Sequence, residues 1–217
     1  MLPLMEPDRP VPAHELNDPR EIRAMAHPLR LRLIEELAAL GTATATDLAE
    51  RVGESPANCS WHLRLLARYG FVEEAGPAEG RRRPWRVVPR TNRWGQRDDN
   101  VELMAAADVA TGVILEQELT ALRDWIVWRR SEDPRWRDAA AMLQSLSWLS
   151  VEELAEVNAA IWAVVARHPE RISDPATRPP GARLVRMVAW AFPDRRYSGA
   201  AEHDPEFAAK QEGERNA

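Results

Sequence analysis

The fold is decided by residues 55–70, SPANCSWHLRLLARYG, which combine the start signals of a helix with two faces of different character. Ser55 is a residue type that caps helix N-termini, and Pro56 suits the first helical position because its missing N–H would be unpaired there in any helix. At about 100° per residue, the apolar side chains fall on one face, which predicts the side that packs into a core. These side chains are Cys59, Leu63 and Leu66.

The opposite face has the composition of a surface that binds the major groove of double-stranded DNA. A small residue near the N-terminus lets the backbone approach the duplex, and the polar side chains beside it supply hydrogen bonds. A tryptophan offers apolar contact to a thymine methyl or a sugar, and arginines contact guanine edges or phosphates. The predicted DNA-binding residues of this helix are Ser55, Ala57, Asn58, Ser60, Trp61, Arg64 and Arg68.

Three helices are predicted before this one. The first begins at Pro19, after an Asn-Asp cap, and the second spans residues 28–40, ahead of a glycine that stops it. The third is capped by Thr44, with Asp47 as the acidic member of a capping box, and ends at Gly53. Because only a Gly-Glu pair separates this short helix from the next cap, the sequence predicts a helix-turn-helix.

A basic hairpin is predicted directly after the helix-turn-helix. The runs FVEEA (71–75) and WRVV (85–88) favour strands, and the intervening GPAEGRRRP (76–84) is punctuated by glycine. Its three basic side chains are Arg81, Arg82 and Arg83. Such a tip would hold phosphates beside the groove, whereas the alternative is a solvated loop.

The runs AHPLRLRLIEEL (26–37), ATDLAERVGES (45–55) and SWHLRLLARYGFVEE (60–74) together resemble the winged helix-turn-helix of ArsR-type bacterial transcriptional regulators. The resemblance covers about residues 16–90. It implies a homodimer that recognises an inverted-repeat operator on double-stranded DNA and changes its affinity on sensing a signal.

The chain departs from the metal-sensing members of that family. They carry paired cysteines at the start of the first helix of the helix-turn-helix, where this chain reads TATATDLAE (42–50). The single cysteine, Cys59, excludes internal disulfides and a multi-thiolate site, and no histidine lies at metal-ligand spacing. We expect no metal and no cofactor. Cys59 is interpreted as a packing residue, with a redox switch as the alternative.

Charge and motifs narrow the class of protein further. The net charge is −5, yet residues 55–97 hold nine basic and three acidic side chains, so a basic face is compatible with an acidic chain. The nucleophile elbow, P-loop, dinucleotide fingerprint and HExxH motif are all missing, so an enzyme is not expected. A signal peptide and a membrane span are not expected either, which favours the cytoplasm.

We predict a mainly α fold with a small β component, divided into four parts. These are a disordered leader (1–15), the winged helix-turn-helix (16–97), a helical C-terminal dimerisation or sensing domain (98–197) and a disordered tail (198–217). The C-terminal domain would begin with a long helix, from a cap at residues 98–100 to about Arg130, whose leucine stripe suits helix pairing.

A second helix of the C-terminal domain is predicted after Ser150, which forms a capping box with Glu153. It is flanked by the short apolar runs MLQSLSWL (142–149) and ARLVRMVAWAF (182–192). Two adjacent strands would therefore be compatible with these runs.

Tryptophans are concentrated in the C-terminal domain. They are Trp125, Trp128, Trp136, Trp148, Trp162 and Trp190. An effector pocket and packing in a core or dimer interface are both compatible with them, and packing is favoured because no polar cluster marks a pocket.

Two functions remain open from the sequence. The first is a dimeric, sequence-specific DNA-binding repressor that is modulated by a small molecule through its C-terminal half. The second is a protein-interaction adaptor in which the winged helix docks a partner through Trp61 and the arginine face.

Overall fold

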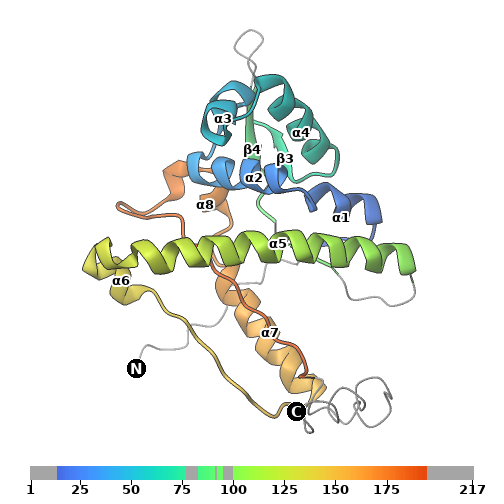
Figure 1. The fold of residues 1–217 in the computed structure, drawn as a ribbon, viewed down its shortest axis with the longest axis vertical. Helices are drawn as coiled ribbons and strands as arrows, with labels where there is room; N and C mark the ends of the chain where they lie inside the picture. Colours follow the sequence, from blue (N-terminus) through green and yellow to red (C-terminus); the bar gives the residue numbers. More distant parts are fainter. Residues whose placement is uncertain (1–13, 77–82, 91, 95–99, 195–217) are drawn as a thin grey trace, which may run out of the picture.

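The structure is a computed structural model that describes residues 14–76, 83–90, 92–94 and 100–194. It is mostly helical with two small sheets, which confirms the predicted fold class (Figure 1). The first four helices are α1 (Pro19–Met25), α2 (Pro28–Leu40), α3 (Ala45–Val52) and α4 (Pro56–Arg68). Their order and bounds confirm the helices predicted for the helix-turn-helix.

Side-chain caps set the start of these helices. Asp18 Oδ1 accepts a hydrogen bond from the Arg20 amide at the start of α1. At α3, Thr44 and Asp47 form the complete capping box. At α4, Ser55 Oγ accepts from the Asn58 amide. Local sequence signals therefore position the helix-turn-helix.

A three-stranded antiparallel sheet follows the helix-turn-helix. The order is β2 (Ala43–Thr44), β4 (Pro84–Val87) and β3 (Val72–Glu74), and β3 and β4 are the two strands of the predicted hairpin. Strand β2 was not predicted, because its two residues pair with a strand about forty positions along the chain. A second, parallel pair joins β1 (His14–Glu15) to β5 (Asn92–Arg93).

The core lies between α1, α2, α3, α4 and the three-stranded sheet, and the first turns of α5 complete it. Helix α5 (Val101–Trp128) starts at the N-cap Asn100 and packs against α1. Its buried residues are Leu103, Ala106, Ala107 and Ala110. Helix α5 begins in this core and continues beyond it. The domain boundary predicted at residue 97 therefore stays a prediction.

The remaining elements are peripheral. They are η1 (Arg129–Ser131), α6 (Pro134–Ala139), α7 (Val151–Val165), α8 (Glu170–Ser173) and η2 (Pro175–Thr177). Helix α7 has the predicted capping box of Ser150 and Glu153, and it extends from the side of α5 opposite to α2 (Figure 1).

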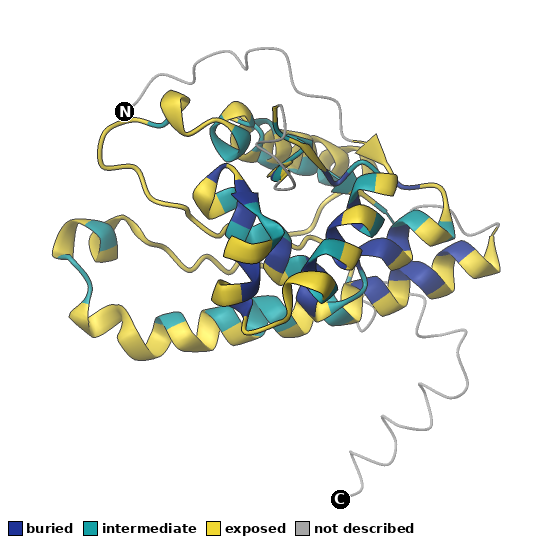
Figure 2. Cartoon of the chain, turned by 90° about the horizontal axis from the view of Figure 1, so that it is seen from above, coloured by how far each residue is buried: buried dark blue, intermediate teal, exposed yellow. Residues whose placement is uncertain are grey.

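The interpretation of the flanking apolar runs as strands is wrong for this chain. Residues 140–150 and 182–194 have no strand structure. Backbone hydrogen bonds define a strand, and neither segment has a neighbouring strand to supply them. Nothing described after Ala110 is buried, so we distinguish an N-terminal half (14–110) from a C-terminal half (111–194) (Figure 2).

Three side chains of the C-terminal half bond to α2: Gln117, Arg178 and Arg186. The Gln117 side-chain amide donates to Glu35 at 2.6 Å. The Arg178 guanidinium donates to the carbonyls of Ala38 and Ala39, at 3.0 and 2.8 Å. These carbonyls lie in the last turn of α2, where no helical N–H reaches them. Arg186 is also paired with Glu35 of α2 and Glu118 of α5.

Candidate nucleic-acid interface

Helix α4 presents the two faces that its sequence predicts. Cys59, Leu63 and Leu66 are fully buried, whereas the opposite face is open to solvent. The exposed residues of that face are Ala57, Trp61, Arg64 and Arg68. The structure thus leaves the predicted DNA-binding face uncovered.

The arginines of this face are not neutralised. Among the described residues, neither Arg64 nor Arg68 forms an ion pair, and Arg64 donates only to Ser60 Oγ, one turn earlier, at 2.8 Å. Some arginines near this face are paired, as Arg51 is with Glu36 and Arg86 with Glu73. A free guanidinium on an exposed helix face retains the charge and donors that bind phosphate or guanine.

Trp61 has 54% of its surface exposed, which is unusual for a tryptophan in a folded domain. Its ring stands edge-on to that of His62, with 4.7 Å between ring centroids. This contact fixes one edge of the indole and leaves the rest available for a ligand.

The polar side chains of the face are partly engaged within the chain. The Ser55 hydroxyl is the N-cap of α4, and Asn58 Nδ2 donates to Glu54 at 3.0 Å. The Asn58 bond is solvent-exposed and contributes little to stability, so a ligand can replace it at small cost, whereas the Ser55 bond stabilises the start of α4 by about 1 kcal/mol.

A shallow hollow of about 320 Å³ joins α4 to the start of α3 and to the hairpin. It is lined by Thr44, Ala45, Thr46, Ser60, Arg64, Glu74, Arg83 and Trp85. Thr46 of α3 therefore lines the same hollow as Arg64. The sequence did not predict that Glu74, the one acidic residue of this lining, would lie here.

Of the three arginines predicted at the tip of the hairpin, or wing, the structure describes Arg83. Arg83 donates to both carboxylate oxygens of Glu74, at 2.9 Å each, across the two strands. This bond raises the pKa of Arg83 and partly neutralises it in the free protein. Arg81 and Arg82 lie outside the described residues.

Comparison with known proteins bears on this surface. Residues 25–75 match a family model described as a helix-turn-helix domain. The matched segment includes α3 and α4, the two helices of the helix-turn-helix. Together with the exposed arginine face, the match supports a DNA-binding transcription regulator.

Two solved structures are similar to part of the chain. Reduced HlyU from Vibrio cholerae is 20% identical, over 43% of this chain and 84% of its own, with a TM-score of 0.28. The second is the homodimeric winged helix-turn-helix DNA-binding domain (fragment 1–100) of Mb0332 from Mycobacterium bovis, described as a possible ArsR-family transcriptional regulator. It is 24% identical, over 52% of this chain and 84% of its own, with a TM-score of 0.29. No curated protein matches the chain significantly.

Behind the exposed face of α4, His62 packs against His27, the N-cap of α2. The ring centroids are 4.8 Å apart, and His27 Nδ1 accepts from the Leu29 amide at 3.1 Å. Burial lowers the pKa of both histidines, and the nearby Arg30 lowers them further. His62 is thus a packing residue, because it is too buried to reach a phosphate.

Cys59 is also a packing residue. Its side chain is fully buried, and burial raises the pKa of the thiol. A protonated, inaccessible thiol is a poor nucleophile and a poor redox sensor.

The C-terminal tryptophans do not form one cage. Trp125 and Trp128 contact each other edge-on at 4.7 Å, and the Arg183 guanidinium lies 4.8 Å from the centre of the Trp136 ring. The other three, Trp148, Trp162 and Trp190, have exposed fractions of 89%, 37% and 60%. Within the described part of the chain, no ring contact joins these three.

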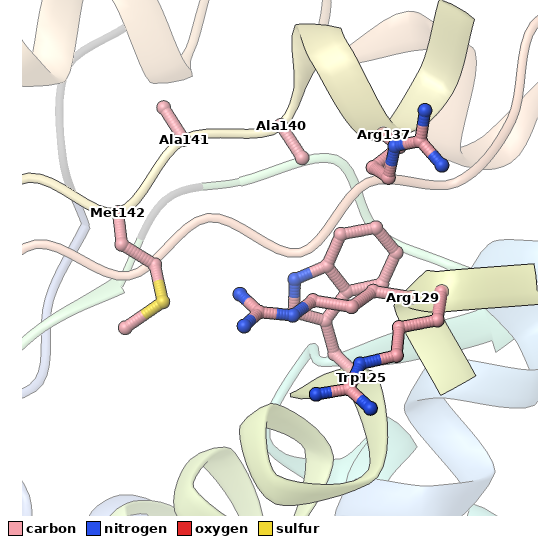
Figure 3. Close-up of a pocket in the computed structure, with 7 residues that line it drawn as sticks. Trp125, Arg129, Arg137, Ala140, Ala141 and Met142 are labelled. Atoms are coloured by element: carbon pink, nitrogen blue, oxygen red, sulfur yellow. The ribbon is translucent and has the colours of Figure 1, made fainter. Parts of the chain in front are cut away.

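Trp125 lines a second hollow, of about 440 Å³, with Met142 and three arginines (Figure 3). The arginines are Arg129, Arg130 and Arg137. Most of the lining residues are exposed, so the hollow is a surface depression rather than an enclosed effector pocket.

Metal-ligand clusters and membrane-spanning helices are the last two features to consider. Over residues 14–76, 83–90, 92–94 and 100–194, no three His, Cys, Asp or Glu side chains meet in a way that could hold a metal ion. In the same residues no helix has the length and apolar character needed to cross a bilayer.

Proposed function

We propose that this protein is a sequence-specific regulator of transcription whose α4 helix enters the major groove of double-stranded DNA. The observation that carries the proposal is the exposed face of α4, where Arg64 and Arg68 lack carboxylate partners among the described residues. The DNA-contacting set is that predicted from the sequence, with the wing arginines as phosphate contacts. The proposed site of action is the cytoplasm.

The proposal extends to a homodimer on an inverted-repeat operator. Two copies of α4 must reach successive major grooves about 34 Å apart, and a two-fold dimer satisfies that geometry. The resemblance to ArsR-type regulators supports a repressor whose affinity is changed by a small molecule. The C-terminal half is the proposed receiver of that signal, since three of its side chains bond directly to α2.

Charge reversal on the exposed face tests this function. In Arg64→Glu, a carboxylate replaces the guanidinium that would face a base or phosphate, so we expect specific affinity to fall roughly 100-fold or more. Fluorescence anisotropy with DNA from upstream of the protein's own gene measures it. The matched control is Arg20→Glu, the same charge reversal at an exposed arginine of α1. It should leave the affinity for DNA within about twofold of that of the unmodified protein.

Two outcomes would contradict the proposal. One is equal loss of affinity in both variants, which would indicate a general charge effect. The other is a failure of the unmodified protein to retain that DNA at low salt, which would favour the adaptor that docks a protein through Trp61. Substitution of the wing arginines should instead weaken all DNA and reduce the salt dependence.

A further inference from the structure

The C-terminal half has apolar side chains but no interior. All of the buried residues of the described chain lie at or before Ala110, whereas most of the exposed large apolar side chains follow it. Leu143, Leu146 and Trp148 have 96%, 88% and 89% of their surfaces exposed. Figure 2 shows the same division, with buried residues confined to the N-terminal half. A single copy therefore leaves this half without a core.

The two segments beside α7 also have unsatisfied backbones. Residues 141–149 and 183–193 are extended and make no main-chain hydrogen bond to any other described residue. Their exposed apolar residues include Leu143 and Leu146 in the first segment and Val185 and Val188 in the second. Extended apolar chain with free N–H and C=O groups is a template for pairing with another strand.

The exposed area is large enough for a stable interface. Residues 140–194 include sixteen exposed large apolar side chains. With about 60% of roughly 150–200 Å² exposed on each, they present on the order of 1,400–1,900 Å² per chain. A standard interface buries about 800 Å² on each partner, and obligate dimers bury more. Monomeric proteins rarely expose apolar patches above a few hundred Å².

Charge identifies the occupant. Residues 140–150 contain no charged side chain, so two copies can meet there without repulsion. A lipid surface does not fit α7, because its charged residues are all acidic, Glu152, Glu153 and Glu156, and anionic membranes attract basic helices. A second copy fits, because it exposes the same apolar side chains and unpaired backbone groups. It is also present in equal amount, and two identical surfaces can pair about a two-fold axis.

We infer that residues 140–194 form an obligate dimerisation unit, in which the extended segments pair with those of a second copy in an intermolecular sheet covered by α7. Each copy supplies the strand that the other lacks, and the apolar side chains around α7 become the shared core. Strands that are incomplete in one chain are thereby complete in two. This inference rests on the dimeric form of the proposed regulator but not on its DNA binding.

Oligomeric mass with a matched pair of tryptophan variants gives the first test. Light scattering of the full chain should give twice the 24.5 kDa of one copy at micromolar concentration. Trp148→Ala should raise the dimer dissociation constant at least tenfold, because a buried interface tryptophan is a typical hot spot. Trp61→Ala removes an exposed tryptophan outside this unit and should leave the mass unchanged.

Hydrogen exchange of backbone amides locates the interface and keeps the test decisive if Trp148→Ala misfolds. Amides of residues 141–149 and 183–193 should be protected in the unmodified dimer and lose protection on dilution. A monomer at micromolar concentration overturns the inference, and so does a dimer in which these amides exchange freely. Should DNA binding survive in a monomer, the inference fails and the proposed function stands.

Discussion

The two halves of this chain start their helices with the same local signals, but only the N-terminal half packs its helices around a buried core. Helix α4 in the N-terminal half and α7 in the C-terminal half both begin at a serine cap, and both carry apolar residues at helical spacing. Yet α4 buries Leu63 and Leu66 completely, whereas α7 buries no residue. The difference indicates that caps and periodicity suffice to start a helix, while a core requires a second surface to pack against.

The largest expected effect comes from deleting one leucine in each half. Leu63→Ala opens a cavity in a closed core, so the free energy of unfolding of the N-terminal half should fall by about 2–5 kcal/mol. Leu143→Ala removes the same atoms from a side chain that is 96% exposed, and should change that free energy by less than about 0.5 kcal/mol. Hydrogen exchange of amides in α2 and α4 measures both variants.

Equal effects of these two leucines would contradict the comparison. They would show that the C-terminal half stabilises the N-terminal core directly. A reduced dimer affinity of Leu143→Ala, with the N-terminal half unchanged, would instead sharpen the contrast by assigning that leucine to the interface between copies.

A pair of glycines probes where the halves touch. Gly41 ends α2 at φ +83°, and a Cβ there would lie 2.4 Å from Cγ of Pro175 in η2. Gly53 ends α3 at φ +72°, with nothing within 4 Å of a Cβ. Alanine at Gly53 costs about 1 kcal/mol for its left-handed backbone. At Gly41, where φ is +83° and ψ is −55°, the backbone lies outside that region and costs more, and the clash with Pro175 should add a further roughly 1 kcal/mol.

Thermal melts of both glycine variants measure this difference. The excess should shrink by the contribution of the clash, about 1 kcal/mol, when Pro175→Ala is combined with Gly41→Ala, because the clashing ring atoms are then removed while the backbone cost at residue 41 stays. If the two single variants are equally destabilised from the outset, η2 is free to move away and the contact between the halves is loose.

Local features of the fold were predictable, and long-range ones were not. The bounds of α3 and α4 follow from Thr44 and Ser55, whose side chains act within three residues. By contrast, Arg178 binds the end of α2 from about 140 residues away, and nothing in the sequence around either site announces that pairing. The prediction of strands on either side of α7 was wrong because it used local sequence alone. A strand also needs a hydrogen-bonding partner, and the described residues of the single chain supply none.

The candidate site shows the same division. A helical wheel was enough to predict that Trp61 and Arg64 are exposed, because the buried stripe of α4 fixes its opposite face. It could not predict that Arg83 is held by Glu74, since that contact depends on how β3 and β4 pair. The hollow beside Arg64 likewise requires three elements to be assembled.

The smallest expected effect is the pH dependence of stability that comes from His27 and His62, whose rings pack against each other at a tilt. Burial lowers the pKa of His27 and His62 in the folded chain, and Arg30 lowers both further, while Glu54 acts in the opposite direction. In the unfolded chain the histidine pKa keeps its ordinary value near 6.5. Below that pH the unfolded chain therefore binds more protons than the folded chain does. Stability should therefore be full above about pH 6.5 and fall as the pH is lowered towards about 5.5.

Substitution of both histidines separates this effect from other titrations. His27→Asn keeps a cap acceptor for the Leu29 amide, and His62→Phe keeps a ring against residue 27 while removing Nδ1, which has no hydrogen-bond partner in the described structure. The double variant should show a flatter loss of stability between about pH 7.5 and about 5.5 in urea titrations. An unchanged slope would mean that the pair titrates alike in the folded and unfolded chain. The acid sensitivity would then come from groups outside the closed core, including those of the C-terminal half.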